Sequence, residues 1–270
     1  MSAPAAPSFA RATTTLARLS LLRVLRGRKL RVAAAAVGVV VLFPAIIALV
    51  EGDAETAGVV RSGIDWGFFR LLVFLLPVLF VSGTVSEEVE GRTLTFLAMR
   101  PVPRASIALG KYLVGTGSAL GVFWAGLVLL HLVGFAATPT LLVEELGGTA
   151  RAGAAGSLLL ATYCAVALFW GTLFPSAAGL LTVLWLGFVE WFGMLLPGMA
   201  RFASMSHFAR ELGGLERAGM DVVSIGGREL VRVPDVALWT GAVVVASEWV
   251  VFLGLALLTM QVRQLRFGKA

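Results

Sequence analysis

Long uncharged stretches alternate with short polar segments along this chain. Residues without a charge run from Leu71 to Ser86, from Tyr112 to Val143, and over the 38 positions from Ala152 to Val189. A helix crosses a hydrocarbon core of about 30 Å with about 20 apolar residues, so the longest stretch has room for two such helices. The stretches lack the two-residue alternation of a membrane β-barrel strand. The pattern therefore predicts an all-α integral membrane protein.

Turn residues and charges divide these stretches into six predicted spans. Phe174-Pro175-Ser176 splits the longest stretch, because proline disfavours helix at the preceding residue and readily begins a new one. Pro77 predicts a kink in the second span. The charged residues between positions 51 and 65 predict a short acidic loop. The predicted spans cover about residues 32–50, 66–84, 105–135, 153–173, 176–197 and 236–262, and residues 198–235 form a hydrophilic loop.

Basic residues are placed unevenly along the chain. Residues 1–31 hold seven of the 22 Lys and Arg residues and no acid. Leucines recur there at every third position, which predicts a basic amphipathic helix lying on anionic membrane lipid. Cytoplasmic loops are enriched in Lys and Arg. Placing both termini and residues 85–111 in the cytoplasm collects 14 of the 22 basic residues there, so the sequence predicts N-in and C-in topology, with residues 198–235 external.

Composition excludes several classes of protein. Of the 270 residues, 58% are hydrophobic and only 14% are charged, which is too apolar for a water-soluble domain. We attribute the net charge of +6 to the excess of basic residues in cytoplasmic segments, and we do not expect the protein to bind nucleic acid. The single cysteine, Cys164, excludes an intrachain disulfide and a zinc site built from thiolates.

Residues 85–104 form a charged segment between two apolar spans. Thr84 and Glu87 have the spacing of a capping box, and further acids follow in the first turn. Pro101 and Pro103 cannot continue a helix, so the helix ends before them. We expect a short helix lying across the cytoplasmic face of the membrane.

Three phrases in and after this segment carry a family resemblance. They read Glu88-x-Glu90-Gly91-Arg92-Thr93-Leu94, Arg100-Pro101-Val102-Pro103-Arg104 and Leu109-Gly110-Lys111. Together they resemble the segment between the second and third spans of the permease subunits of type-two ABC exporters. In that family an acid-x-x-Gly-Thr-Leu phrase precedes Pro-Val-Ser-Arg and Gly-Lys. This chain departs from the pattern by inserting Arg92 and by carrying Pro103 where a serine is usual.

The resemblance implies a membrane complex rather than a single subunit. It implies a homodimer, or a dimer with a related permease, in the bacterial cytoplasmic (inner) membrane. It also implies two separate ABC ATPase subunits that bind ATP and Mg²⁺, with residues 85–104 acting as a coupling helix. The residues implied at the ATPase interface are Glu87, Glu88, Glu90, Gly91, Arg92, Thr93, Leu94, Leu97, Arg100, Pro101 and Arg104.

The chain itself lacks an ATP-binding P-loop. Gly110-Lys111 is followed by Tyr112, and the glycine that a P-loop needs upstream is missing. We therefore expect a non-catalytic subunit without a cofactor of its own, and ATP hydrolysis on a partner chain.

An intramembrane protease is one alternative. Residues 87–92 also fit the E-E-x-x-x-R phrase of CAAX-type proteases. Those enzymes need histidine phrases as well, because a water must be activated inside the membrane. The two histidines, His131 and His207, lack the phenylalanine at minus four that the first of these phrases requires.

A proton-coupled secondary transporter is the other alternative. Glu190 and Glu248 lie inside predicted spans, where an unpaired carboxylate costs at least about 2.5 kcal/mol. Both are therefore predicted to be protonated or paired. They are candidates for a polar pathway, an interior gate or proton sites, and structural hydrogen bonding between helices explains them equally well.

Two further patterns allow a functional and a structural interpretation. Met199, Met205 and His207 gather beyond the fifth span and are candidates for holding Cu(I), although an amphipathic outer patch explains them as well. Glycines at positions 117 and 121, with Ala125, form a small-residue stripe in the third span. Such a stripe lets a second helix approach closely.

Overall fold

The computed structural model describes residues 27–51, 53–84, 104–193, 202–215, 222–225, 228–232 and 238–262, together with Thr14, Leu21 and Val24. Six helices in this part of the chain are long and apolar enough to cross a membrane. The prediction of six spans is confirmed, and the chain is a multi-pass membrane protein. Numbered one to six in chain order, the candidate spans are Arg28–Ile47, Glu55–Ser82, Ala105–Gly134, Leu146–Leu173, Pro175–Phe192 and Leu238–Val262.

Several spans are built from more than one helical element, and π-helical stretches occur in spans two and five. The elements are α2 (Arg28–Glu51), α3 (Asp53–Gly63), π-helical η1 (Ile64–Leu72), α4 (Val73–Pro77), π-helical η2 (Val78–Ser82), α7 (Arg104–Gly134), α8 (Pro139–Glu144), α9 (Leu146–Leu173), the 3₁₀ turn η3 (Pro175–Ala177), α10 (Ala178–Trp185), π-helical η4 (Leu186–Phe192), α12 (Met205–Gly213), β1 (Val222–Ile225), β2 (Arg228–Arg232) and α13 (Leu238–Val262).

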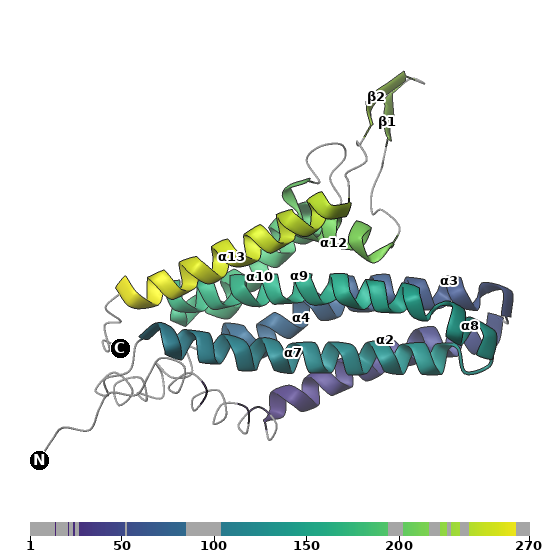
Figure 1. Ribbon diagram of the computed structural model, residues 1–270, viewed down its shortest axis with the longest axis horizontal. Coiled ribbons are helices and arrows are strands. Elements are labelled where there is room, and N and C mark those ends of the chain that lie inside the picture. The colour runs from purple at the N-terminus through teal and green to yellow at the C-terminus, as the bar shows by residue number, and fades with distance from the viewer. Residues whose placement is uncertain are drawn as a thin grey trace, which may run out of the picture.

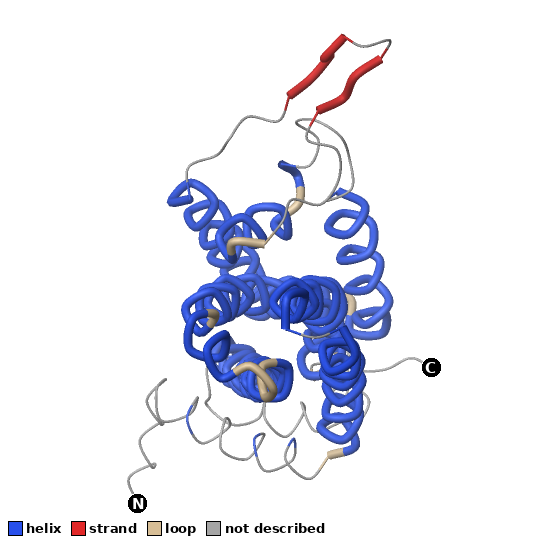
Figure 2. The backbone as a smooth tube through the Cα atoms, turned by 90° about the vertical axis from the view of Figure 1, so that its right-hand side faces the viewer, coloured by secondary structure: helices blue, strands red, loops and turns tan. Residues whose placement is uncertain are grey.

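The long helices lie side by side in one elongated bundle (Figure 1). Figure 2 looks along that bundle. We call the end where α7 begins and α13 finishes the proximal end, and the end that carries α8 the distal end. Span four, α9, is the most enclosed helix, because 72% of its apolar window is buried against 50% or less in each other span. The rest of the bundle is organised around α9.

Small residues let α9 occupy this central position. A Cβ added at Gly156 would lie 2.5 Å from the ring of Phe123, and one added at Gly153 would overlap the ring of Trp124. Small residues at such positions let helix backbones approach closely in a membrane, where hydrophobicity alone does not drive helices together. The Trp124 Nε1–H also donates to Ser157 Oγ at 2.8 Å. These contacts pack α7 closely against α9.

The charged residues between positions 51 and 65 lie in helices rather than in the acidic loop that the sequence predicts. α3 begins at Asp53 and continues into η1. Arg61 donates to both carboxylate oxygens of Glu145 at 2.7 and 3.0 Å, which joins α3 to the region between α8 and α9. Glu55–Ser82 is about 40 Å long at 1.5 Å per residue, enough to cross the headgroup layers as well as the hydrocarbon core. Hydropathy could not locate the start of this helix, because its first turns extend into the polar layer.

Prolines end helices where the sequence predicts a break. α9 stops at Leu173, Phe174 leaves the helical region with φ −134° and ψ 76°, and Pro175 begins the turn that precedes α10. Pro77 closes α4, and the π-helical η2 follows it directly. The fourth span begins earlier than predicted, at Leu146.

The segment predicted as a hydrophilic loop, residues 198–235, contains regular structure. It holds the helix α12 and an antiparallel hairpin in which Val222 of β1 pairs with Arg232 of β2. The regular structure of the described residues is therefore helical except for this hairpin, which Figure 1 shows projecting from the bundle near the start of α13. Residues 85–103, 194–197 and most of the predicted N-terminal helix (1–31) lie outside the described residues.

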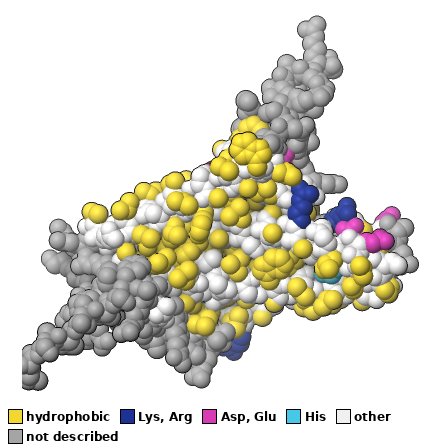
Figure 3. All heavy atoms as spheres, in the orientation of Figure 1, with side chains coloured by type: hydrophobic (Ala, Val, Ile, Leu, Met, Phe, Trp, Pro, Cys, Tyr) yellow, Lys and Arg dark blue, Asp and Glu magenta, His cyan; other side chains and the backbone are white. Residues whose placement is uncertain are grey.

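The surface of the bundle agrees with a membrane location. Hydrophobic side chains cover its length on the face shown in Figure 3, and acidic side chains on that face gather toward the distal end. Many of the large apolar side chains are well exposed, including Phe43 at 69% and Phe188 at 71%. Exposed apolar area on this scale is the expected surface of a bundle that faces lipid.

The predicted small-residue stripe on α7 makes no close contact with the helices that the structure describes. A Cβ added at Gly117 or Gly121 would meet no atom within 4 Å, and Ala125 is exposed. The intrachain contacts use Gly115 and Gly126 instead, against Val81 and Val37 respectively. α7 therefore packs against the described helices through a different face from the one that carries the stripe.

We expect Gly115→Ala to lower the melting temperature of the purified protein and Gly117→Ala to leave it unchanged. The Cβ added at Gly115 would lie 2.7 Å from Val81 Cγ2 and 3.0 Å from the carbonyl oxygen of Phe80, whereas the Cβ at Gly117 meets nothing. Overpacking of this kind costs about 1–3 kcal/mol. Thermal unfolding in detergent measures the difference, and equal melting temperatures would contradict this packing.

Candidate functional site

Glu190 is completely buried inside the bundle, where its Oε2 atom gathers hydrogen bonds from two other elements. The hydroxyl of Tyr163 on α9 donates to it at 2.8 Å. At the start of α12, Ser204 Oγ donates at 3.0 Å and the Ser206 backbone N–H donates at 3.2 Å. Glu190 shows no exposed area, and neither does Tyr163. One carboxylate oxygen thus joins span five, span four and α12.

The contact with Ser206 completes the N-terminus of α12. The first N–H groups of a helix have no partner inside the helix, and their partial positive charge favours an acidic group. Ser204 occupies the N-cap position but makes no side-chain cap bond to α12. Its hydroxyl is directed instead to Glu190, including the backbone oxygen at 3.0 Å. Glu190 therefore provides from another helix the cap that α12 does not provide for itself.

The other end of α12 is held by a basic residue of α9. Arg151 donates through Nε to the carbonyl of Leu212 at 2.7 Å and through Nη2 to that of Glu211 at 3.3 Å. Gly214 ends the helix in the left-handed conformation, with φ 71°. The last carbonyl groups of a helix carry partial negative charge, so a cation is stabilising there. Both ends of α12 thus meet groups of the complementary charge.

An ion-pair cluster fixes the side of α12 to span two. Arg210 of α12 pairs with Asp65 of η1, and Asp65 Oδ2 also lies 3.4 Å from Arg70 Nη2. The guanidinium of Arg70 lies over the ring of Trp66, with 3.8 Å between its Cζ atom and the ring centroid. The side chains of Arg70, Asp65 and Arg210 are 15% exposed or less. Charged groups inside membrane proteins pair in this way because an isolated charge is costly there.

Glu248, the second acid predicted inside a span, comes near the same region. It is half-buried on α13, close enough to Glu190 for the two carboxyl groups to interact electrostatically. Its neighbour Trp249 donates Nε1–H to the hydroxyl of Tyr112 at 2.6 Å, and that hydroxyl donates to the carbonyl of Ala161 at 3.0 Å. The structure therefore brings together two acids that are 58 positions apart in the chain.

The two oxygens of Glu190 differ in their surroundings. Oε2 accepts the bonds described above, whereas Oε1 is buried without a hydrogen-bond partner among the described residues. A protonated carboxyl group has one O–H donor and keeps acceptor capacity on its other oxygen. The contacts that position α12 therefore use only one oxygen of Glu190.

The predicted ATPase-contact residues from Glu87 to Pro101 lie outside the described residues, and Arg104 is the first residue of α7. The two flanks of this segment are nevertheless joined directly. Lys111 of α7 donates through Nζ to the carbonyl of Thr84, which follows η2. Lys111 is 9% exposed. One hydrogen bond therefore connects the end of span two, at Thr84, to a point seven residues after the start of α7, at the proximal end.

Two of the three residues predicted as candidates for Cu(I) are buried in the described structure. Met199 lies outside the described residues, and Met205 and His207 are each 2% exposed. The His207 ring packs against two aromatic neighbours, with its centroid 5.5 Å from that of Phe202 and 5.4 Å from that of Phe208. Within the described ranges no three His, Cys, Asp or Glu side chains gather as a metal site would require.

His131 joins neighbouring elements through both of its ring nitrogens. Nδ1 lies 2.9 Å from Thr149 Oγ1, and Nε2 lies 3.0 Å from the carbonyl oxygen of Leu142. The imidazole is 4% exposed and packs edge-on against Phe135. Its contacts are those of a buried residue that connects α7 with α8 and α9.

Sequence reasoning missed the partners of Glu190. Tyr163 is one of only two tyrosines in the chain, and it lies within the longest uncharged stretch. Ser204 and Ser206 lie in residues 198–235, which the sequence predicts as a hydrophilic loop. The signal available for Tyr163 was a polar residue inside an apolar span. No local pattern indicates that Ser204 and Ser206 contact Glu190.

Neither the models of known protein families nor the curated proteins match this chain. The conclusions about its function therefore depend on the sequence phrases and on the geometry described above.

We expect Glu190→Leu to release α12 and Glu190→Gln to retain most of its packing. Leucine removes the acceptor of the Ser206 N–H, at about 1–3 kcal/mol for a buried group. The Tyr163 hydroxyl keeps only its contact with Ser206 Oγ. Glutamine keeps a carbonyl oxygen that can accept both bonds. A cysteine at Ala209, which is fully buried on α12, reports release through its rate of maleimide labelling in a Cys164→Ala background.

Glu144→Leu is the control for loss of an acid, because Glu144 is exposed at the distal end. Labelling should be fast in Glu190→Leu and slow in both Glu144→Leu and Glu190→Gln. Equal rates in all three variants would show that Glu190 does not hold α12.

Proposed function

We propose that this multi-pass membrane protein is the permease subunit of an ATP-driven ABC exporter in a bacterial cytoplasmic membrane. It forms a homodimer, or a dimer with a related permease, and works with two separate ATPase subunits that bind ATP and Mg²⁺. Two observations support the proposal together. Residues 85–104 contain the exporter-like phrases, and Lys111 is hydrogen-bonded to Thr84 beside that segment.

The bond between Lys111 and Thr84 supports a coupling role for a physical reason. A segment that transmits movement must push on the helices at both of its ends, and here those ends belong to spans two and three. Because Lys111 of α7 is bonded to Thr84 at the end of span two, we expect a displacement of residues 85–103 to act on both spans. Rigid movement of packed elements is a common way to change the conformation of a membrane-spanning site.

The distribution of charge supports an inward location for this segment. Under N-in and C-in topology the basic residues of the N-terminal region, the coupling segment and the C-terminal tail all face the cytoplasm, in accord with the positive-inside bias. ATPase subunits in the cytoplasm could then reach the proximal end of the bundle. The P-loop motif missing from this chain is consistent with ATP binding by those subunits.

Co-purification tests the proposal directly. The tagged protein, extracted from its native membranes in mild detergent, should bring with it an ATPase subunit and ATPase activity. Glu88→Ala/Glu90→Ala should lose both, because the acids of the coupling segment contact the ATPase. Glu55→Ala/Glu144→Ala removes the same charge from two exposed positions elsewhere and should lose neither.

Failure of any ATPase to accompany the unaltered protein would contradict the exporter assignment. If Glu88→Ala/Glu90→Ala still retained the ATPase, the exporter assignment would stand. The proposed contact between residues 85–104 and the ATPase would then be wrong.

A proton-coupled secondary transporter is the second candidate, and the buried Oε1 of Glu190, which has no hydrogen-bond partner among the described residues, favours it. Glu248 is half-buried on α13 and is the second acid inside a span. Under the exporter proposal, liposomes that contain this chain alone should conduct no protons under an imposed pH gradient. A pH-sensitive dye inside the liposomes measures the flux. A flux abolished by Glu190→Gln or Glu248→Gln, and retained in Glu144→Gln, would favour the secondary transporter instead.

A further inference from the structure

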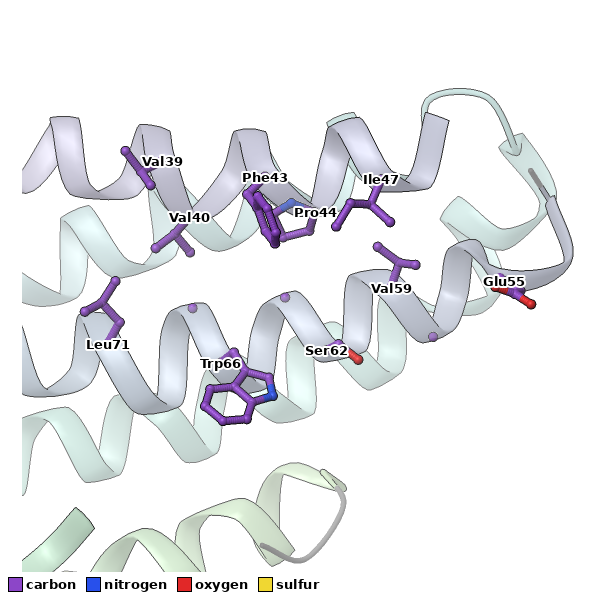
Figure 4. A pocket seen from close by; sticks show the side chains of 13 residues that line it. Val39, Val40, Phe43, Pro44, Ile47, Glu55, Val59, Ser62, Trp66 and Leu71 are labelled. Carbon is purple, nitrogen blue, oxygen red and sulfur yellow. The ribbon is translucent and has the colours of Figure 1, made fainter. Parts of the chain in front are cut away.

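An open groove of about 760 Å³ lies between α2 and the first half of span two. Figure 4 shows Phe43, Pro44 and Ile47 of α2 on one side and Val59 of α3 on the other, with Trp66 further along η1. Its volume is within the range of sites that hold small molecules. Phe43 is 69% exposed and Trp66 is 59% exposed, so the groove opens to the outside of the bundle.

The groove exists because small residues line the α3 side. At Gly63 the two helices touch, since an added Cβ would lie 2.7 Å from Pro44 Cγ. At Gly58 an added Cβ would meet no atom of the described residues within 4 Å. Gly58 and the exposed Ser62 therefore leave space where larger side chains would fill the surface between the helices.

The length of the groove matches one leaflet of a bilayer. From Glu55 to Leu71 the helix rises about 24 Å, and half a bilayer with its headgroup layer is about 20–23 Å thick. The remaining turns, from Leu71 to Ser82, rise about 16 Å and cross the other half. The groove thus runs from the headgroup level at Glu55 to near the bilayer midplane at Leu71.

We propose that this groove binds a bilayer phospholipid with a primary-amine headgroup, whose acyl chain lies along Phe43 and Trp66. A phospholipid ends at the midplane as the groove does, whereas a helix of a second copy would continue across both leaflets. Glu55 is the one charged residue of the lining, and it is exposed at the headgroup end. Its carboxylate attracts an ammonium group and repels a purely anionic headgroup. The proposal does not depend on the exporter assignment, because it concerns only the first two spans.

Photo-crosslinking in lipid nanodiscs tests the proposal. Two probes carry the same diazirine-labelled acyl chain, one on phosphatidylethanolamine and one on phosphatidylglycerol. The full-length protein is labelled in the nanodisc and then digested, and mass spectrometry of the peptides locates the adducts. The ethanolamine probe should label α2 and α3 at the groove more strongly than it labels exposed apolar residues of α7, such as Leu129 and Leu132, which serve as the bulk-lipid reference.

Variants separate a built site from general lipid contact. Gly58→Leu, alone and combined with Ser62→Leu, should reduce groove labelling to the bulk-lipid reference. Gly38→Leu is the matched control, because it adds the same side chain to open space on α2 outside the groove and should preserve labelling. Glu55→Gln should abolish the preference for the ethanolamine probe and leave acyl labelling in the groove.

Three outcomes would overturn the proposal. These are groove labelling no stronger than that of Leu129 and Leu132, labelling unchanged in the Gly58→Leu/Ser62→Leu variant, and equal labelling by both probes in the unaltered protein. Co-purification of an ATPase is scored separately, so the lipid site and the exporter assignment can fail independently.

Discussion

The buried N-terminus of α12 is the constraint on which the described structure depends most. Inside a membrane protein a backbone N–H without an acceptor costs several kcal/mol, and irregular backbone at that depth is tolerated only where the protein itself supplies partners. Glu190 is the acceptor for Ser206 N–H, and it is held by Tyr163 of the central helix. This carboxyl group therefore stabilises the position of α12 in the bundle. The acid is thus explained structurally before any catalytic or transport role is invoked.

The same principle organises the helices around α9. Small residues bring α7 close, and polar contacts then fix the arrangement, as where Thr162 Oγ1 lies 3.3 Å from the carbonyl oxygen of Val245 on α13. Trp249, Tyr112 and the carbonyl of Ala161 link α13, α7 and α9 in one chain of hydrogen bonds. A movement imposed at the Lys111–Thr84 bond would meet this network in α7 first. The bundle is therefore suited to moving packed helices together rather than to bending each of them.

The two oxygens of Glu190 are used differently in the structure. Oε2 is occupied by donors that position α12, and Oε1 is buried without a partner among the described residues. The π-helical η4 carries Glu190, and η1 carries Asp65, which pairs with α12. These stretches, of seven and nine residues, are longer than the single-turn bulges in which π-helix usually occurs. Two of the three π-helical stretches thus present the acids that contact α12 or its flank.

The sequence by itself determined the membrane class, the six spans and the break at Phe174-Pro175, because hydropathy and proline act over a single helix. It also predicted that Glu190 must be paired or protonated, since the cost of a carboxylate in a span is local. Tertiary structure alone decided which atoms pair with it and that α3 extends helix through the predicted acidic loop. It also decided that α7 packs through Gly115 and Gly126 rather than through the stripe at Gly117. These outcomes depend on which helices become neighbours, and a close approach or a shared hydrogen bond between residues 43 positions apart, such as Tyr163 and Ser206, leaves no periodic signal in either segment.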